Sequence, residues 1–120
     1  MNGFKIKKEN GKYYFALYPS NNHHQRMGQS KAYRTRDECK TAMLEFLEYV
    51  GKHTLDKETN GKVKIIREKE NGINRYWFKY MRDGELIFYR TIKYGQRESC
   101  KKGINSIYEN RNKYTKELFD

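Results

Sequence analysis

The sequence predicts an α+β fold built from two copies of a strand-strand-strand-helix unit. The main observation is an internal repeat, because six residues of the first half match residues of the second half at a constant offset of 61 positions, four of them identically. In both halves, alternating runs joined by Asn-Gly precede a segment with helical periodicity. The matching pairs are Tyr33/Tyr94, Arg36/Arg97, Cys39/Cys100, Lys40/Lys101, Met43/Ile104 and Phe46/Ile107.

The organisation expected is one domain over residues 1–120, made of two repeats, about 1–52 and 63–114, joined by a connector at 53–62. A chain of this length supports one core rather than two, so neither repeat should be stable alone. Aromatic residues make up 15% of the chain. Because disordered chains are poor in aromatics, we expect a folded domain with a core of Tyr and Phe.

The first two strands are expected at 4–8 and 12–18, joined by Asn10-Gly11. Both residues of this dipeptide accept the positive φ that a type I′ hairpin turn requires. Proline and polar residues at 19–22 predict the next turn.

A third strand is predicted at about 25–33, with Gly28 as a bulge or a point of close approach. A helix should follow, capped by Thr35 and ended by Gly51. Its apolar face recurs at helical spacing in Cys39, Ala42, Met43, Phe46, Leu47 and Val50.

The second repeat follows the same plan, with strands expected at 63–68, 75–81 and 85–94. Asn71-Gly72 supplies its hairpin turn, and Ile73-Asn74 are interpreted as residues that lengthen the loop.

The second helix should bury Cys100, Ile104, Ile107 and Tyr108. Gly103 stands where the first helix has Ala42, which suggests a close contact between helices. The tail from Lys113 is interpreted as a short strand or a frayed end.

The run 83–87, Tyr94 and the run 98–107 closely resemble the YegP-like family, a small bacterial domain of unknown function. The resemblance covers nearly the whole chain, strongly in the second repeat and moderately in the first, where 42–43 and 23–25 depart from it. It implies two strand-strand-strand-helix-strand units that pair into one antiparallel sheet and exchange their last strands, with two helices packed on one face. No catalytic or binding residues come with the family.

The formal net charge of +11 is carried by both repeats. A positive field over the whole body attracts polyanions, although excess lysine also serves solubility alone. No apolar run is long enough for a signal peptide or a membrane span, so we expect a cytoplasmic protein without membrane contact.

Two helices on one face leave the opposite face of the sheet open. Because strand side chains alternate, five residues should lie there if Tyr13, Phe15, Leu17, Tyr76, Phe78 and Tyr80 face the helices. Rings and cations together are typical of sheets that bind single-stranded nucleic acid. The same patch could instead fill cross-strand pairs, dock an acidic protein partner or mediate self-association. The five residues are Tyr14, Tyr18, Trp77, Lys79 and Met81.

A three-stranded sheet backed by a helix is also similar to the arm-binding domain of phage-type integrases, on residues 10–13 and 33–38. That resemblance implies a sheet laid in the DNA major groove. The residues that would contact phosphates or guanines are then Arg26, Lys31 and Arg34, or Arg90 and Lys93.

No enzymatic constellation is recognised, and we expect neither catalysis, cofactor nor metal. The adjacent His23 and His24 point apart on a strand and have no carboxylate cluster nearby. Cys39 and Cys100 lack a histidine at a diagnostic spacing and are interpreted as buried apolar thiols.

Overall fold

The computed structural model describes residues 3–18, 26–51 and 62–112. The expected turn at 19–22, both adjacent histidines, nearly all of the connector and the tail from residue 113 lie outside these ranges. The elements are β1 (Gly3–Glu9), β2 (Lys12–Tyr18), β3 (Gly28–Ser30), α1 (Arg36–Gly51), β4 (Val63–Glu70), β5 (Ile73–Arg82), β6 (Glu85–Tyr89) and α2 (Arg97–Glu109).

The strands form one six-stranded antiparallel sheet in the order β1-β2-β3-β6-β5-β4. The first unit, β1 to α1, meets the second, β4 to α2, where β3 pairs with β6. Among the described residues no strand is exchanged: β4, which follows α1, pairs with β5 of its own unit. The exchange implied by the family resemblance is therefore not found in these ranges.

Both Asn-Gly turns close their hairpins as expected. Asn10 and Gly11 have φ values of 52° and 76°, and Asn71 and Gly72 have 53° and 79°. These are the left-handed conformations that a type I′ turn requires at both positions.

The interpretation of Ile73-Asn74 as added loop is wrong. Ile73 pairs with Glu70 and Asn74 with Lys69, so both residues belong to β5. Because β4 is extended as well, the extra residues lengthen the ladder instead of the loop.

The third strand of each unit is shorter than expected. Regular pairing ends at Ser30 in β3 and at Tyr89 in β6, and beyond them Tyr33 and Tyr94 make single bridges to Tyr13 and Tyr76. In the first unit the Phe15 N–H donates to Ser30 Oγ at 3.0 Å, so a side chain takes a role that a backbone carbonyl would have in a ladder.

Gly28 is a point of close approach between β3 and β6, as expected. A Cβ at this position would overlap the Phe88 ring and lie 3.2 Å from the carbonyl oxygen of Tyr89.

We expect Gly28→Ala to lower the free energy of unfolding by about 1–3 kcal/mol, because the added methyl overpacks the strand contact. Urea unfolding followed by circular dichroism measures this change. Gly95→Ala is the control, since a Cβ there would meet only Arg75 Nη1 at 3.5 Å. Equal stability of the two variants would contradict the close packing.

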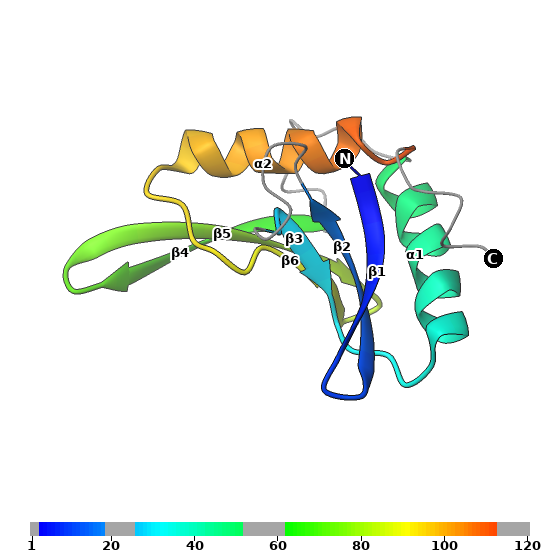
Figure 1. Cartoon of the computed structure of the whole chain (residues 1–120). Coiled ribbons are helices and arrows are strands. Elements are labelled where there is room, and N and C mark those ends of the chain that lie inside the picture. Colours follow the sequence, from blue (N-terminus) through cyan, green and yellow to red (C-terminus); the bar gives the residue numbers. More distant parts are fainter. Residues whose placement is uncertain (1–2, 19–25, 52–61, 113–120) are drawn as a thin grey trace.

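Both helices lie on the same side of the sheet, and no other element of the described ranges covers its other side (Figure 1). α1 packs on β1 and β2, and α2 packs on β5. The Glu38 N–H donates to Thr35 Oγ1 at 3.1 Å, which confirms the predicted cap of α1. α1 ends at Gly51, as expected.

The core lies between the helices and the sheet and contains residues of both units. Phe88 is its centre: its ring stacks on Phe46 at a centroid distance of 4.5 Å and also contacts Phe4, Phe15 and Tyr80. Cys39 and Cys100 are buried and are not joined by a disulfide, and burial raises the pKa of Cys39 to about 12. The thiols therefore serve as packing groups.

Gly103 is not a helix–helix contact. A Cβ there would overlap the Tyr94 hydroxyl and lie 3.3 Å from the Phe78 ring. The glycine makes room for a tyrosine of its own unit, because Tyr94 bridges to β5 directly beneath α2.

Candidate functional site

The open face is the side of the sheet opposite the helices. Cross-strand register places one continuous row of side chains across all six strands of this face. Three of its six members are lysines, and two of these lie on the edge strands β1 and β4. From β1 to β4 the row is Lys5, Ala16, Gln29, Tyr89, Lys79 and Lys64.

Aromatic rings flank this row. Lys7 pairs with Tyr14, and Ile66 pairs with Trp77. Lys79 Nζ lies 5.9 Å from the Trp77 ring. Tyr14 and Trp77 are half-buried, so part of each ring is accessible beside a cation.

Tyr18 does not offer an accessible ring, contrary to the expectation. The side chain is 4% exposed, and its hydroxyl accepts a hydrogen bond from Arg26 Nε at 3.0 Å. Lys5 and Lys7 Nζ lie 5.8 and 5.7 Å from the ring. Burial raises the pKa of Tyr18.

Arg26 already contacts other side chains of the protein on this face. It forms an ion pair with Glu9 and donates to Gln29 Oε1 at 2.6 Å. Gln29 Nε2 in turn donates to the Tyr89 hydroxyl at 3.2 Å. This chain of contacts joins β1, β2, β3 and β6 and orients the central tyrosine of the row.

A hollow of about 290 Å³ lies beside the row in the second unit. Trp77 Nε1 is buried there, and no acceptor among the described residues meets hydrogen-bond geometry with it. The indole lies close enough to the Glu68 carboxylate to help lower the pKa of Glu68. The hollow is lined by Glu68, Trp77, Tyr89, Arg90, Thr91 and Lys93.

Lys93 stands at the rim of this hollow between two carboxylates. Its Nζ lies 2.8 Å from Glu68 and 2.5 Å from Glu70. These hydrogen bonds raise the pKa of Lys93, and the one from Lys93 is the main cause of the lowered pKa of Glu68. Lys93 is therefore charged at neutral pH but already paired.

The remaining predicted site residues do not share one surface. Arg90 is 8% exposed, and its guanidinium donates to backbone carbonyls, so it is not an accessible nucleic-acid contact. Lys31 pairs with Glu85 and lies over the Tyr33 ring, beside α1. Arg34 is exposed just before α1. Met81 is half-buried at the end of β5.

Among the charged and aromatic members of the row and its flanks, sequence reasoning missed Lys5, Lys7, Lys64 and Tyr89. The first three could have been found by applying strand alternation to β1 and β4 as well as to β2 and β5. The position of Tyr89 depends on the β3–β6 pairing, which joins residues far apart in the chain.

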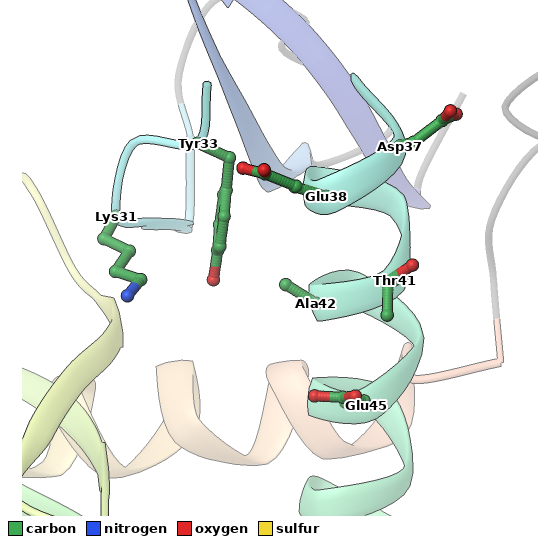
Figure 2. Close-up of a pocket in the computed structure, with 7 residues that line it drawn as sticks. All are labelled: Lys31, Tyr33, Asp37, Glu38, Thr41, Ala42 and Glu45. Atoms are coloured by element: carbon green, nitrogen blue, oxygen red, sulfur yellow. The ribbon is translucent and has the colours of Figure 1, made fainter. Parts of the chain in front are cut away.

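A second cavity, of about 560 Å³, lies on the helix side, between the Tyr33 segment and α1 (Figure 2). Burial is the main cause that raises the pKa of Tyr33, to about 12, so the phenol is neutral at physiological pH. The lining residues are Lys31, Tyr33, Asp37, Glu38, Thr41, Ala42 and Glu45.

Two further features of the described residues concern chemistry and membranes. No group of three or more His, Cys, Asp or Glu side chains in the described ranges is placed to hold a metal ion. None of the helices in these ranges has the length and apolar character needed to cross a bilayer.

The architecture is an α+β domain with one six-stranded antiparallel sheet and two helices on one face. It is similar to the solution NMR structure of yegP from E. coli, a protein of unknown function, with a TM-score of 0.68 and 14% sequence identity. The match covers 95% of this chain and 89% of that chain. No protein-family model and no curated protein matches the sequence. At this identity the likeness shows the fold, and the expected YegP-like fold is confirmed.

Proposed function

We propose that this protein is a non-enzymatic module that binds single-stranded nucleic acid across the open face of its sheet. The observation that carries the proposal is the row from Lys5 to Lys64, in which lysines lie at both edges and Tyr89 lies between them. Lysines neutralise phosphates, and neighbouring rings such as Tyr14 and Trp77 offer faces on which bases stack.

The width of the sheet favours a single strand over a duplex groove. Six strands at about 4.8 Å spacing span about 24 Å, whereas the major groove is about 12 Å wide and admits a two-stranded ribbon. The three-stranded sheet of the integrase resemblance is here one half of a continuous sheet, with β3 paired to β6.

A lysine-rich surface also favours nucleic acid over a protein partner, because the cores of protein interfaces are depleted in lysine. Trp77 Nε1 supplies a buried donor beside the hollow that an acceptor on a base could use. An acidic protein partner or self-association is the outcome to consider if nucleic acid does not bind.

The first test is fluorescence anisotropy with labelled single-stranded DNA, single-stranded RNA and duplex DNA at about 50 and 200 mM salt. If Lys5, Lys7, Lys64 and Lys79 neutralise four phosphates, affinity for a single strand should fall about 50-fold over this range. Weaker binding of the duplex is expected. Negligible binding at low salt, or preference for the duplex, would contradict the proposal.

We expect Trp77→Ala to weaken single-strand binding by about 1–3 kcal/mol, because one stacked base is lost. Lys79→Ala should weaken binding and reduce the salt dependence, whereas Lys102→Ala removes the same charge from exposed α2 and should change affinity little. Circular dichroism checks that each variant is folded. Equal effects of the two lysine variants would show that binding does not use the open face.

A further inference from the structure

The cavity between Tyr33 and α1 is on the opposite side of the sheet from the proposed nucleic-acid surface. Figure 2 shows the Tyr33 ring between Lys31 on one side and Ala42 and Glu38 on the other. The Glu38 and Glu45 side chains extend from α1 toward this space, whereas Asp37 points away from it (Figure 2). The cavity therefore has an aromatic wall facing two carboxylates.

The corresponding space in the second unit is filled by protein. There Tyr94 places its hydroxyl against Gly103, where a Cβ would overlap it. The first unit has Ala42 at the matching helix position, and its methyl prevents Tyr33 from lying against α1 in the same way. One methyl group thus accounts for an open cavity in one unit and a closed contact in the other.

The second unit also shows which group packs on the ring of Tyr94, the counterpart of Tyr33. The Arg90 guanidinium lies 4.3 Å from the Tyr94 ring centroid. The backbone N–H of Arg90 donates to the carbonyl of Phe78. In the first unit, the residue at the matching position beside Phe15 is Ser30. Tyr33 therefore has no internal arginine as a neighbour at that place, and its nearby cation, Lys31, is paired with Glu85.

The cavity continues into a groove along α1, and this helix is rich in carboxylates. The helix carries four carboxylates against two cations, although the chain as a whole has a net charge of +11. Tyr33, Ala42 and Glu45 also line an adjoining hollow with Phe15, Phe46 and Ile87, and Glu45 continues into a third with Tyr49 and Arg82. The lining of the three hollows carries four carboxylates against two cations, Lys31 and Arg82. An excess of carboxylates over an apolar floor suits an extended basic peptide better than an isolated ion.

We propose that this groove binds an arginine-containing peptide segment of a partner protein, with the guanidinium between the Tyr33 ring and the carboxylates of Glu38 and Glu45. A guanidinium stacks on aromatic faces and pairs with carboxylates through its planar fork, which an ammonium does not do. The present neighbour of Glu45 is Arg82, whose Nη1 is 3.7 Å away in an exposed pair that a ligand can replace. The inference is independent of nucleic-acid binding, because it uses the helix side.

The test is fluorescence anisotropy with the fluorescein-labelled octapeptide (Gly-Arg)₄ and with versions in which lysine or citrulline replaces arginine. Citrulline keeps the shape of arginine without its charge. We expect the arginine peptide to bind at least about tenfold more tightly than the citrulline peptide, and more tightly than the lysine peptide. Because the protein is strongly positive, general electrostatics opposes all cationic peptides, so binding requires a local acidic site.

Variants locate the binding site. Glu45→Gln should weaken the arginine peptide about threefold to tenfold, and Ala42→Leu should fill the cavity and abolish binding. Glu109→Gln, which removes an exposed carboxylate from α2, should have no effect. The proposal would be overturned by absence of binding, by equal affinity for the citrulline or lysine peptide, or by insensitivity to both groove variants. It would also be overturned if free arginine bound as tightly as the peptide. Circular dichroism of Glu45→Gln and Ala42→Leu separates loss of binding from loss of fold.

Discussion

Replacing Phe88 by alanine is expected to lower the free energy of unfolding by about 3–5 kcal/mol. The ring is fully buried on β6 and contacts four other aromatic rings: Phe4 on β1, Phe15 on β2 and Phe46 on α1 from the first unit, and Tyr80 on β5 from the second. Removing it leaves a cavity where the two units meet. Since small domains have about 5–15 kcal/mol of stability, urea unfolding should show a large loss or an unfolded chain.

A double-mutant cycle tests the reason for this loss. A Cβ on Gly28 would overlap the Phe88 ring, so Gly28→Ala should cost less in the Phe88→Ala background than in the wild type. Phe88→Leu, which fills part of the space, should be intermediate in stability. Additive effects of the two alanine substitutions, or a loss below about 1 kcal/mol for Phe88→Ala, would contradict the central position of this ring.

Arg90→Met is expected to lower the free energy of unfolding by about 2–4 kcal/mol, although the two side chains have similar lengths. Arg90 Nε donates to the Ile92 carbonyl at 2.5 Å, and Nη1 donates to the carbonyls of Arg26 and Met27 at 3.2 Å each. Methionine would leave these acceptors without their donor, and the stacking on Tyr94 would be lost. Urea unfolding monitored by circular dichroism measures the effect.

Two control variants separate charge from geometry. Arg90→Lys keeps the charge but cannot satisfy three carbonyls with a fork, so an intermediate loss is expected. Arg67→Met, at an exposed position of β4, should change stability by no more than about 0.5 kcal/mol. If Arg90→Met were as stable as the wild type and instead lost nucleic-acid affinity, Arg90 would be a binding residue and not a link between the units.

Much of the fold could be predicted from local patterns. The Asn-Gly turns, the cap at Thr35 and the apolar faces of both helices are encoded by residues within one or two turns of each other. The lengths of the third strands were wrong, because the ends of β3 and β6 depend on their pairing with each other and with β2 and β5. The interpretation of Ile73-Asn74 failed for the same reason, since only the partner strand shows whether added residues join a ladder or a loop.

The candidate site was predicted in part. Strand alternation placed Trp77 and Lys79 on the open face, because alternation is a local property of a strand. It could not show that Arg26 covers Tyr18, or that Arg90 reaches carbonyls of the first unit. A long, flexible cationic side chain can hydrogen-bond to solvent, to a ligand or to backbone carbonyls. Which of these it contacts depends on acceptors that lie far away in the chain.

The sequence by itself determined the order of elements in each unit, the turns that close the hairpins and the excess of positive charge. Only the tertiary structure decided which cations remain accessible, how the row from Lys5 to Lys64 crosses the sheet, and that Ala42 lines a cavity whereas Tyr94 packs against Gly103. The physical reason is the range of the interactions. Turn and helix preferences act between neighbours in sequence, whereas burial, register and side-chain pairing are set by residues that become neighbours only when β3 meets β6 and the helices cover the sheet.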